Sequence, residues 1–475
     1  MLCECPASHI APKMATTAAH TGELAHTLRP RHVVMISLGG IIGAGIFVGS
    51  SGSIHLAGPA VVVSYTLGGL LVFLIMRMLG EMALARPGLG TFAEYAALGL
   101  GRWAGFMTGW LYWYFWVITV GAETVAGANL IEPWLRHAGY AVSTAQIGFA
   151  LVALLTVTNL FAVRTYGELE FWFATLKVAA IVVFIVVALA FVAFFGPDLK
   201  TTYRTLAGDG GLAPLGPSSI IAAIPIVMFS MMGSEVATIA AVESTEPAEN
   251  VARATRTVAL RILIFYVLSI SLIVAIVPWR SLEVGRSPFV TALETMHFQA
   301  AAPFMSVIVL TAVLSCLNSG IYITSRMLHE LAARREAPRF LVATAGNRAP
   351  WIGILLSSLA GCLAAAASVA SPKGVFLFLI NTSGAVILVI YMVIALAQIR
   401  LRRRLESERA TLRLRMWLYP WLSWLVVAGI CVTLVLMAFK PDLRSQLFWS
   451  AVSVAVVALA YAVLRAVGGA RTSQA

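Results

Sequence analysis

Residues 33–50 read Val33-Val34-Met35-Ile36-Ser37-Leu38-Gly39-Gly40-Ile41-Ile42-Gly43-Ala44-Gly45-Ile46-Phe47-Val48-Gly49-Ser50, a helix-length apolar stretch with glycines at its centre. Each glycine destabilises a helix by about 1 kcal/mol relative to alanine, and an amide freed inside a bilayer needs a partner. Amides at the start of a half-helix are partly positive, so an unwound segment there can hold a carboxylate. The alternative is close helix packing through Gly39, Gly43 and Gly45.

The composition places the chain in a membrane. Of its 475 residues, 60% are hydrophobic and 11% are charged, and the mean hydropathy is +0.89, whereas soluble domains have about 45–50% apolar and about 25% charged residues. Windows of about 20 apolar residues predict twelve transmembrane helices, near residues 33–52, 58–79, 103–127, 145–163, 170–195, 218–242, 257–278, 303–326, 350–370, 374–397, 417–439 and 445–466. The sequence therefore predicts an all-α membrane protein.

The net charge of +12 follows the membrane topology. With the N-terminus in the cytoplasm, the inner connections hold 24 lysine and arginine residues and the outer connections hold 8. This bias predicts that both termini are cytoplasmic, and no nucleic-acid partner is expected. The basic run Arg400, Arg402, Arg403 and Arg404 is expected to face membrane lipid at the inner surface.

The five cysteines form no disulfide or metal pattern. Cys316, Cys362 and Cys431 lie in apolar spans, where a buried thiol is the usual state. Cys3 and Cys5 form one Cys-x-Cys pair without a second pair, which is weak evidence for a metal. We expect no metal and no cofactor, and the absence of paired catalytic motifs in an aqueous domain argues against an enzyme.

The sixth span is interrupted like the first. The run Ile224-Pro225-Ile226-Val227-Met228-Phe229-Ser230-Met231-Met232-Gly233-Ser234-Glu235 places a proline, small residues and a carboxylate at mid-membrane, which should break the helix. Five spans separate the two breaks, the spacing of two inverted five-helix repeats whose broken helices cross near the midplane. We therefore expect a flexible cytoplasmic tail (1–28), a ten-helix core (29–397), a basic cytoplasmic connection (398–416), two further helices (417–466) and a second cytoplasmic tail (467–475).

Few ionisable side chains lie inside the predicted spans, and such residues mark functional sites because a charge in the membrane is costly. Lys177 is the one basic residue deep in a span; it either carries a proton or extends to the inner headgroups. Glu123 is expected to meet a substrate ammonium, to relay a proton or to hydrogen-bond a neighbouring helix. Glu235 is expected to line the substrate path or to cap amides freed by the break.

Several motifs occur together in this chain, namely Gly40-Ile41-Ile42-Gly43-Ala44-Gly45-Ile46-Phe47-Val48-Gly49, Gly58-Pro59-Ala60, Met76-Arg77-Met78-Leu79-Gly80-Glu81-Met82, Gly167-Glu168-Leu169-Glu170-Phe171-Trp172 and Leu317-Asn318-Ser319-Gly320. With them the chain resembles the amino acid/polyamine/organocation superfamily, specifically its bacterial amino acid transporter family, over about residues 29–465. The resemblance implies two inverted five-helix repeats plus two helices, and proton-coupled import of an amino acid across the cytoplasmic membrane.

The resemblance also implies roles for individual residues. The backbone from Ile42 to Gly45, including Gly43 and Ala44, would hold the substrate carboxylate. The backbone around Phe229, Ser230 and Gly233 would face the substrate amine. Lys177 matches the family's lysine in span five, whose ammonium occupies a place that sodium takes in related transporters.

Within the family, further stretches are similar to permeases for 4-aminobutyrate (GABA), namely Gly101-Arg102-Trp103-Ala104-Gly105, Thr238-Ile239-Ala240-Ala241-Val242-Glu243-Ser244, Ser315-Cys316-Leu317-Asn318-Ser319 and Arg413-Leu414-Arg415-Met416-Trp417-Leu418-Tyr419-Pro420-Trp421-Leu422. GABA permeases tend to have Ala-Ser-Leu-Phe where this chain has Ala44-Gly45-Ile46-Phe47, which removes a hydroxyl beside the carboxylate site. We expect GABA or a related ω-amino acid as the substrate. The alternatives are a permease for neutral α-amino acids or proline, and an exchanger without proton coupling.

Overall fold

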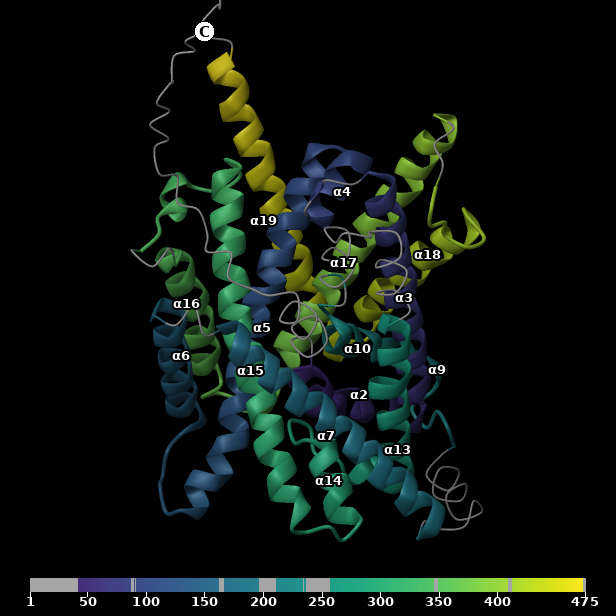
Figure 1. Cartoon of the computed structure of the whole chain (residues 1–475), viewed down its shortest axis with the longest axis vertical. Coiled ribbons are helices and arrows are strands. Elements are labelled where there is room, and N and C mark those ends of the chain that lie inside the picture. The colour runs from purple at the N-terminus through teal and green to yellow at the C-terminus, as the bar shows by residue number, and fades with distance from the viewer. Residues whose placement is uncertain are drawn as a thin grey trace, which may run out of the picture.

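The computed structural model describes residues 42–86, 89, 91–161, 166–195, 211–233, 235, 257–345, 349–408 and 412–472, with the backbone alone for 166–169 and 467–472. The chain forms a bundle of long helices along one common direction (Figure 1). No strand occurs in these residues. The predicted tail 1–28, Cys3, Cys5, Gly39 and the stretch Thr238 to Ser244 lie outside the described residues.

The elements follow in chain order, with η marking short π- or 3-10-helical segments. The first half contains η1 (Gly45–Gly49), α2 (Ser50–Ala57), η2 (Gly58–Ala60), α3 (Val61–Ala85), α4 (Phe92–Leu100), α5 (Arg102–His137), α6 (Thr144–Phe161) and α7 (Tyr166–Phe194). The second half contains α9 (Pro217–Ala222), α10 (Ile224–Met231), η3 (Ile262–Leu268), α13 (Ser269–Ile276), η4 (Trp279–Ser281), α14 (Pro288–Thr295), α15 (Ala301–Ala333), η5 (Arg339–Val342), α16 (Trp351–Ala367), α17 (Pro372–Ser407), α18 (Trp421–Phe439) and α19 (Pro441–Thr472).

The length and apolar composition of the helices indicate that the bundle lies in a membrane. Nine helices in the described part are long and apolar enough to cross a membrane, and two shorter apolar helices accompany them at Pro217–Met231 and Trp351–Ala367. Large apolar side chains such as Leu154, Trp172 and Val456 are exposed on the outside of the bundle, where they can contact lipid chains. The prediction of an all-α, multi-pass membrane protein is confirmed.

In the described residues, the first irregular span is helical from Gly45, and the second loses its helix at Met232. The first begins with the π-helical turn η1, continues as α2 and ends at Gly58, whose φ is +59°. Helix α10 ends at Met231, because Met232 is extended and Gly233 has a φ of +95°. Pro225 lies in the first turn of α10 rather than at a break inside it, where its missing N–H leaves no hydrogen bond unmade.

Small residues allow α10 to approach its neighbours closely. A Cβ on Gly45 would lie 2.7 Å from the Cα of Ser230, and a Cβ on Gly384 of α17 would overlap the carbonyl of Pro225. Backbones can approach this closely only where glycine stands at the crossing. The two broken segments therefore pack against each other and against α17.

Helix α17 extends beyond its predicted span at the end of the bundle that carries α4. Helix α17 continues to Ser407, ten residues beyond the core boundary expected at residue 397. This extension turns Arg402 toward α3, where its Nη1 donates to Glu81 Oε2 at 2.6 Å and both side chains are buried. A lipid-facing role is therefore wrong for Arg402, while Arg400, Arg403 and Arg404 are exposed.

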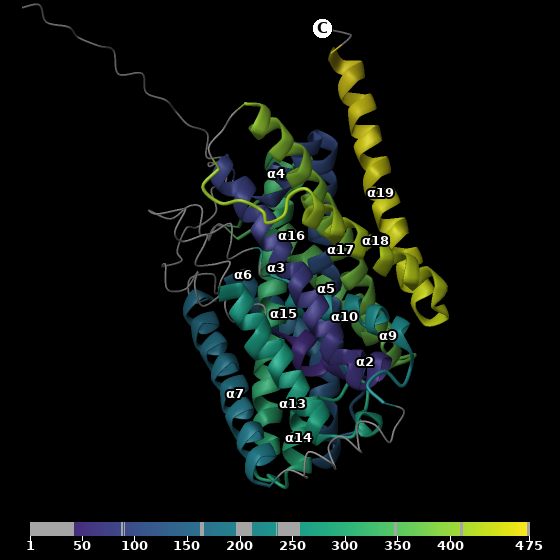
Figure 2. The ribbon, with the colours of Figure 1, turned by 90° about the vertical axis from the view of Figure 1, so that its right-hand side faces the viewer.

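The last two helices lie on one flank of the bundle. Figure 2 shows α19 along the outer edge, with α18 between it and the core helices and α7 on the opposite side. Side chains of α19 are mostly exposed. The functional residues are accordingly found among the earlier helices.

Candidate functional site

The start of η1 is bound by a carboxylate from another helix. Glu123, in the middle of α5, is 1% exposed, and the amide of Ala44 donates to its Oε1 at 2.9 Å and its Oε2 at 3.1 Å. A Cβ on Gly43 would lie 2.5 Å from Glu123 Oε1 and 2.7 Å from Cys316 Sγ, so only glycine admits the carboxylate. The thiol of Cys316 also hydrogen-bonds this carboxyl. The backbone at the break therefore binds an anion, which the protein itself supplies here.

A small cavity adjoins this carboxylate. Its volume is about 20 Å³, enough for about one water molecule. The lining residues are Gly43, Gly45, Phe115, Trp116, Thr119, Glu123, Phe229, Met232 and Cys316. The structure thus brings together four of the predicted site residues from three separate segments of the chain.

The other predicted backbone residues lie near the breaks without lining this cavity. Ala44 takes part through its amide. Ile42, Ser230 and Gly233 are buried, and Ser230 Oγ donates to the carbonyl of Ile226 in its own helix at 3.0 Å. Their contribution is therefore to the shape of the segments rather than to the cavity wall.

Part of the cavity wall on α5 comes from residues that were not among the predicted site residues. Trp116, Thr119 and Glu123 are spaced by three and four residues, so they share one face of the helix. This periodicity, continued back from Glu123, was the available signal for Trp116 and Thr119. Met232 belongs to the non-helical end of α10 and gave no such signal.

Glu235 is held by groups of the protein. Tyr112 Oη donates to its Oε1 at 2.9 Å and Tyr391 Oη to its Oε2 at 3.3 Å. The amide of Gly233 donates to both oxygens, at 3.2 and 3.1 Å. This carboxylate therefore satisfies a backbone amide freed at the end of α10 and ties the break to α5 and α17.

Lys177 lies at the centre of a second buried cluster. Its side chain is 0% exposed, which contradicts an extension to the inner headgroups. Its Nζ donates to Ser315 Oγ at 2.9 Å, and Ser315 Oγ donates to the carboxylate of Glu170, 2.9 Å from Oε1 and 2.8 Å from Oε2. Sequence reasoning took Glu170 as the start of a span and missed it as a partner, although a spacing of seven residues places it on the same helix face as Lys177.

Successive stretches of α5 line three cavities. Gly105, Gly109 and Tyr112 line one of about 390 Å³, the stretch from Phe115 to Glu123 lines the small central one, and Asn129 to Arg136 line one of about 1310 Å³. Because α5 is one continuous helix, the small cavity lies between the two larger ones. The three cavities therefore follow one another along α5, with the small one in the middle.

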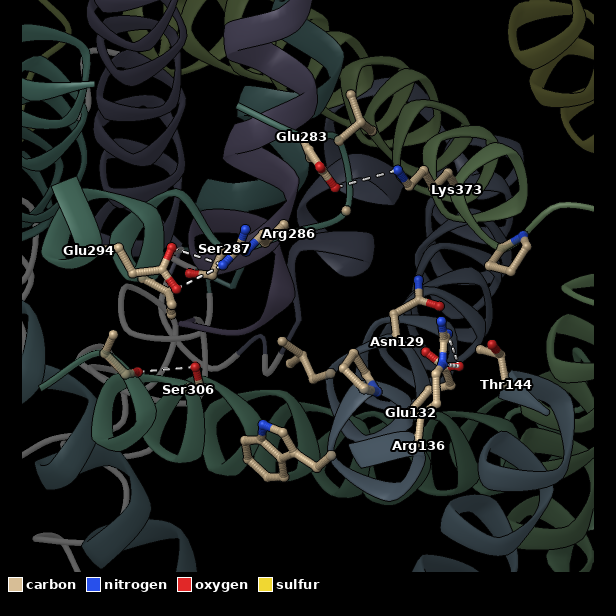
Figure 3. Close-up of a pocket in the computed structure, with 18 of the residues that line it drawn as sticks. Asn129, Glu132, Arg136, Thr144, Glu283, Arg286, Ser287, Glu294, Ser306 and Lys373 are labelled. Atoms are coloured by element: carbon tan, nitrogen blue, oxygen red, sulfur yellow. Dashed lines mark hydrogen bonds and ion pairs between the residues drawn. The ribbon is translucent and has the colours of Figure 1, made fainter. Parts of the chain in front are cut away.

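The largest of these three cavities is a cleft with charged side chains around it, at the end of the bundle where α14 lies. Figure 3 shows three ion pairs around it: Glu132 with Arg136, Arg286 with Glu294 at 2.7 Å, and Glu283 with Lys373 at 3.8 Å. These side chains come from α5, α14, α17 and the segment before α14. The mixed charges give the cleft no net charge from these residues, which suits entry of a zwitterion better than entry of a simple ion.

A bundle of membrane-length helices with buried ionisable side chains beside a small cavity is consistent with a membrane transporter. The described residues contain no group of three or more His, Cys, Asp or Glu side chains that could hold a metal ion. A family model described as amino acid permease matches residues 32–471. The chain belongs to the amino acid permease family.

Relatives within this family include three named for GABA. The gamma-aminobutyric acid permease of Bacillus subtilis (strain 168) is 45% identical over 92% of this chain and 93% of its own length. The probable GABA permease of Pseudomonas aeruginosa is 44% identical over 90% of each chain. The gamma-aminobutyric acid permease of Escherichia coli (strain K12) is 42% identical over 88% of this chain and 90% of its own.

Proposed function

We propose that this chain is a proton-coupled permease that imports GABA or a related ω-amino acid across the cytoplasmic membrane. The names of three relatives at 42–45% identity support this substrate. The proposed topology has twelve spans in two inverted five-helix repeats plus two helices, with both termini in the cytoplasm. Helices of the described residues overlap each of the twelve predicted spans, and the excess of inner basic residues supports the orientation.

One observation carries the coupling to protons, namely the carboxylate of Glu123 on the amide of Ala44. The carboxylate of an amino acid substrate needs the same amide, so the two anions compete for it. Once displaced, the Glu123 carboxylate is a charge inside the membrane without its hydrogen-bond donors, which costs free energy. Uptake of a proton neutralises this charge and removes the cost. Substrate binding and proton binding therefore favour each other.

Lys177 supplies the positive charge of this region. Glu123, Glu170 and Lys177 are all buried, and each carboxylate lies within electrostatic range of Lys177. Two carboxylates and one ammonium carry a net charge of about −1 when all are ionised, and one added proton makes the group neutral. We infer that this proton is the one that crosses with the substrate.

The substrate amine meets the end of α10. The last carbonyl groups of a helix, here Met228 to Met231, have no intrahelical donor, so they can accept hydrogen bonds from an ammonium. Phe229 lines the cavity at this end. Glu235 serves as the cap that holds the break in shape. The cavity must widen from about 20 Å³ to admit a substrate, which fits an occluded state of an alternating-access cycle.

Uptake into proteoliposomes that contain the purified chain tests this function. We expect unlabelled GABA to compete best with labelled GABA, ahead of proline, alanine and phenylalanine. Putrescine should fail because it has no carboxylate for the Ala44 amide. An acid exterior should raise accumulation.

The alternatives give different results in the same assay. Competition by α-amino acids and none by GABA would identify a neutral α-amino acid or proline as the substrate instead of GABA. Equal accumulation with and without a pH gradient would identify an exchanger without proton coupling.

A further inference from the structure

The contacts of Lys177 form a continuous hydrogen-bonded chain of three side chains. Ser315 Oγ accepts from Lys177 Nζ at 2.9 Å and donates to Glu170, with 2.8 Å as the shorter distance. All three side chains are at most 2% exposed. A hydroxyl that accepts from an ammonium and donates to a carboxylate joins an acid to a base through two short hydrogen bonds.

The position of Glu170 gives the hydrogen-bonded chain of side chains a direction across the membrane. Glu170 precedes Lys177 by seven residues on α7, about two turns or about 10 Å along the helix. Because α7 enters the membrane from the inside in the proposed topology, Glu170 lies on the inner side of Lys177. Ser315 spans this step from the neighbouring helix α15.

We propose that Glu170, reached from Lys177 through the Ser315 hydroxyl, passes the coupled proton toward the cytoplasm. The proposal rests on the proposed proton coupling. In the transfer an N–H bond of the Lys177 ammonium breaks as Ser315 Oγ takes that proton. Ser315 releases its own proton to a Glu170 oxygen, which leaves a neutral amine, an intact hydroxyl and a neutral carboxylic acid. Glu170 then releases the proton to the inner solution, and protonated Glu123 restores the Lys177 ammonium.

Other titratable groups face this relay and fix its charge balance. Glu123 acts on it from α5 and Cys316 from α15, and Tyr266 of η3 lies within electrostatic range of Cys316. Replacement of Glu170 by glutamine leaves one carboxylate, Glu123, opposite the Lys177 ammonium. That pair is neutral without an added proton, and the glutamine carbonyl can still accept from Ser315.

The experiment compares proton flux with substrate flux for the full chain in proteoliposomes. Glu170→Gln and Ser315→Ala should keep labelled-GABA counterflow at equal pH within about threefold of the unmodified chain. Both should lose GABA-induced internal acidification at least tenfold, read with an internal pH dye. Ser315→Thr, which keeps the hydroxyl, should retain the acidification.

Ser357→Ala is the matched control for removal of a buried hydroxyl. Ser357 is 0% exposed, and its hydroxyl accepts from the Thr324 hydroxyl and donates to the Gly353 carbonyl, neither of which is ionisable. This variant should keep both fluxes. The control separates loss of a relay from the general effect of removing a buried serine.

Each result decides for or against the relay. Normal acidification in Glu170→Gln or in Ser315→Ala overturns it, as does loss of acidification in Ser315→Thr with counterflow intact. If Glu170→Gln does not reach the membrane, the Ser315→Ala and Ser315→Thr pair gives the answer. Absence of acidification in the unmodified chain, with counterflow present, would instead overturn the proposed proton coupling.

Discussion

At the scale of a single residue, the proposed proton coupling depends on Glu123. Glutamine at this position carries no charge, so its displacement from the Ala44 amide requires no proton. We expect Glu123→Gln to keep GABA counterflow and to lose accumulation driven by a pH gradient, so that the inside-to-outside GABA ratio falls to about one. Radiolabelled uptake with and without the gradient measures both. Continued accumulation in this variant would remove Glu123 from the coupling.

Gly43 keeps the approach to the amide open. A Cβ there would lie within 2.8 Å of atoms of Glu123 and Cys316, and relief of such overpacking typically costs about 1–3 kcal/mol. We expect Gly43→Ala to weaken GABA binding about 5- to 150-fold, the same energy expressed as affinity, with the protein still present in the membrane.

The control for this substitution is Gly429→Ala on α18, where a Cβ would meet nothing within 4 Å. Its GABA affinity should equal that of the unmodified chain. Equal GABA affinities of the Gly43 and Gly429 variants would show that Gly43 contributes to helix packing alone.

At the scale of elements, Glu81 joins α3 to α17 and to the connection before α18. Its carboxylate accepts from Gln398 Nε2 at 2.7 Å, from Arg402 Nη1 at 2.6 Å and from the amide of Met416. In a double-mutant cycle of Glu81→Gln and Arg402→Gln, we expect a coupling of about 1–3 kcal/mol, because this pair is buried. Unfolding of the purified variants in detergent measures the coupling.

The exposed pair of Arg86 and Glu408 is the matched control at the same end of the bundle. Its atoms are also 2.6 Å apart, but the side chains are 43% and 46% exposed. Water screening limits such pairs to about 1 kcal/mol or less. A coupling at Glu81 no larger than at Arg86 would show that the buried cluster does not hold these elements together.

The structure also shows which elements could be read from the sequence. Runs of apolar residues predict membrane-spanning helices. The helices of the structure overlap the predicted spans for this reason. The C-terminal end of α17 could not be predicted in this way. A run of arginines is compatible with a helix that packs on the protein and also with a surface that contacts lipid headgroups. Arg402 is buried only because Glu81, 321 residues earlier, lies opposite it.

The same limit applies to the site. Residues that are costly in a bilayer can be identified from the sequence as candidates for the site. They include the glycines Gly43 and Gly45 and the charged residues Lys177 and Glu123. Which charge meets which break depends on tertiary contacts: Glu123 reaches Ala44 across 79 residues, and Ser315 reaches Glu170 across 145. No local periodicity encodes such pairs.

At the scale of the whole molecule, the distribution of basic residues predicts the orientation in the membrane. With 24 of them in inner connections and 8 in outer ones, we expect a reporter fused after Arg404 to lie in the cytoplasm and one fused near residue 210 to lie outside. Paired reporters, each active on one side of the membrane only, measure this. An outside signal after Arg404 would contradict the twelve-span topology.

The central claim is that the substrate carboxylate replaces Glu123 on the Ala44 amide and that a proton compensates the displaced charge. Titration calorimetry of GABA binding to the purified chain, in buffers of different ionisation enthalpy, counts the protons taken up. We expect about one proton per GABA for the unmodified chain, hence tighter binding at lower pH, up to about tenfold per pH unit. We expect none for Glu123→Gln. Binding of GABA without proton uptake, or equal uptake by both proteins, would contradict it.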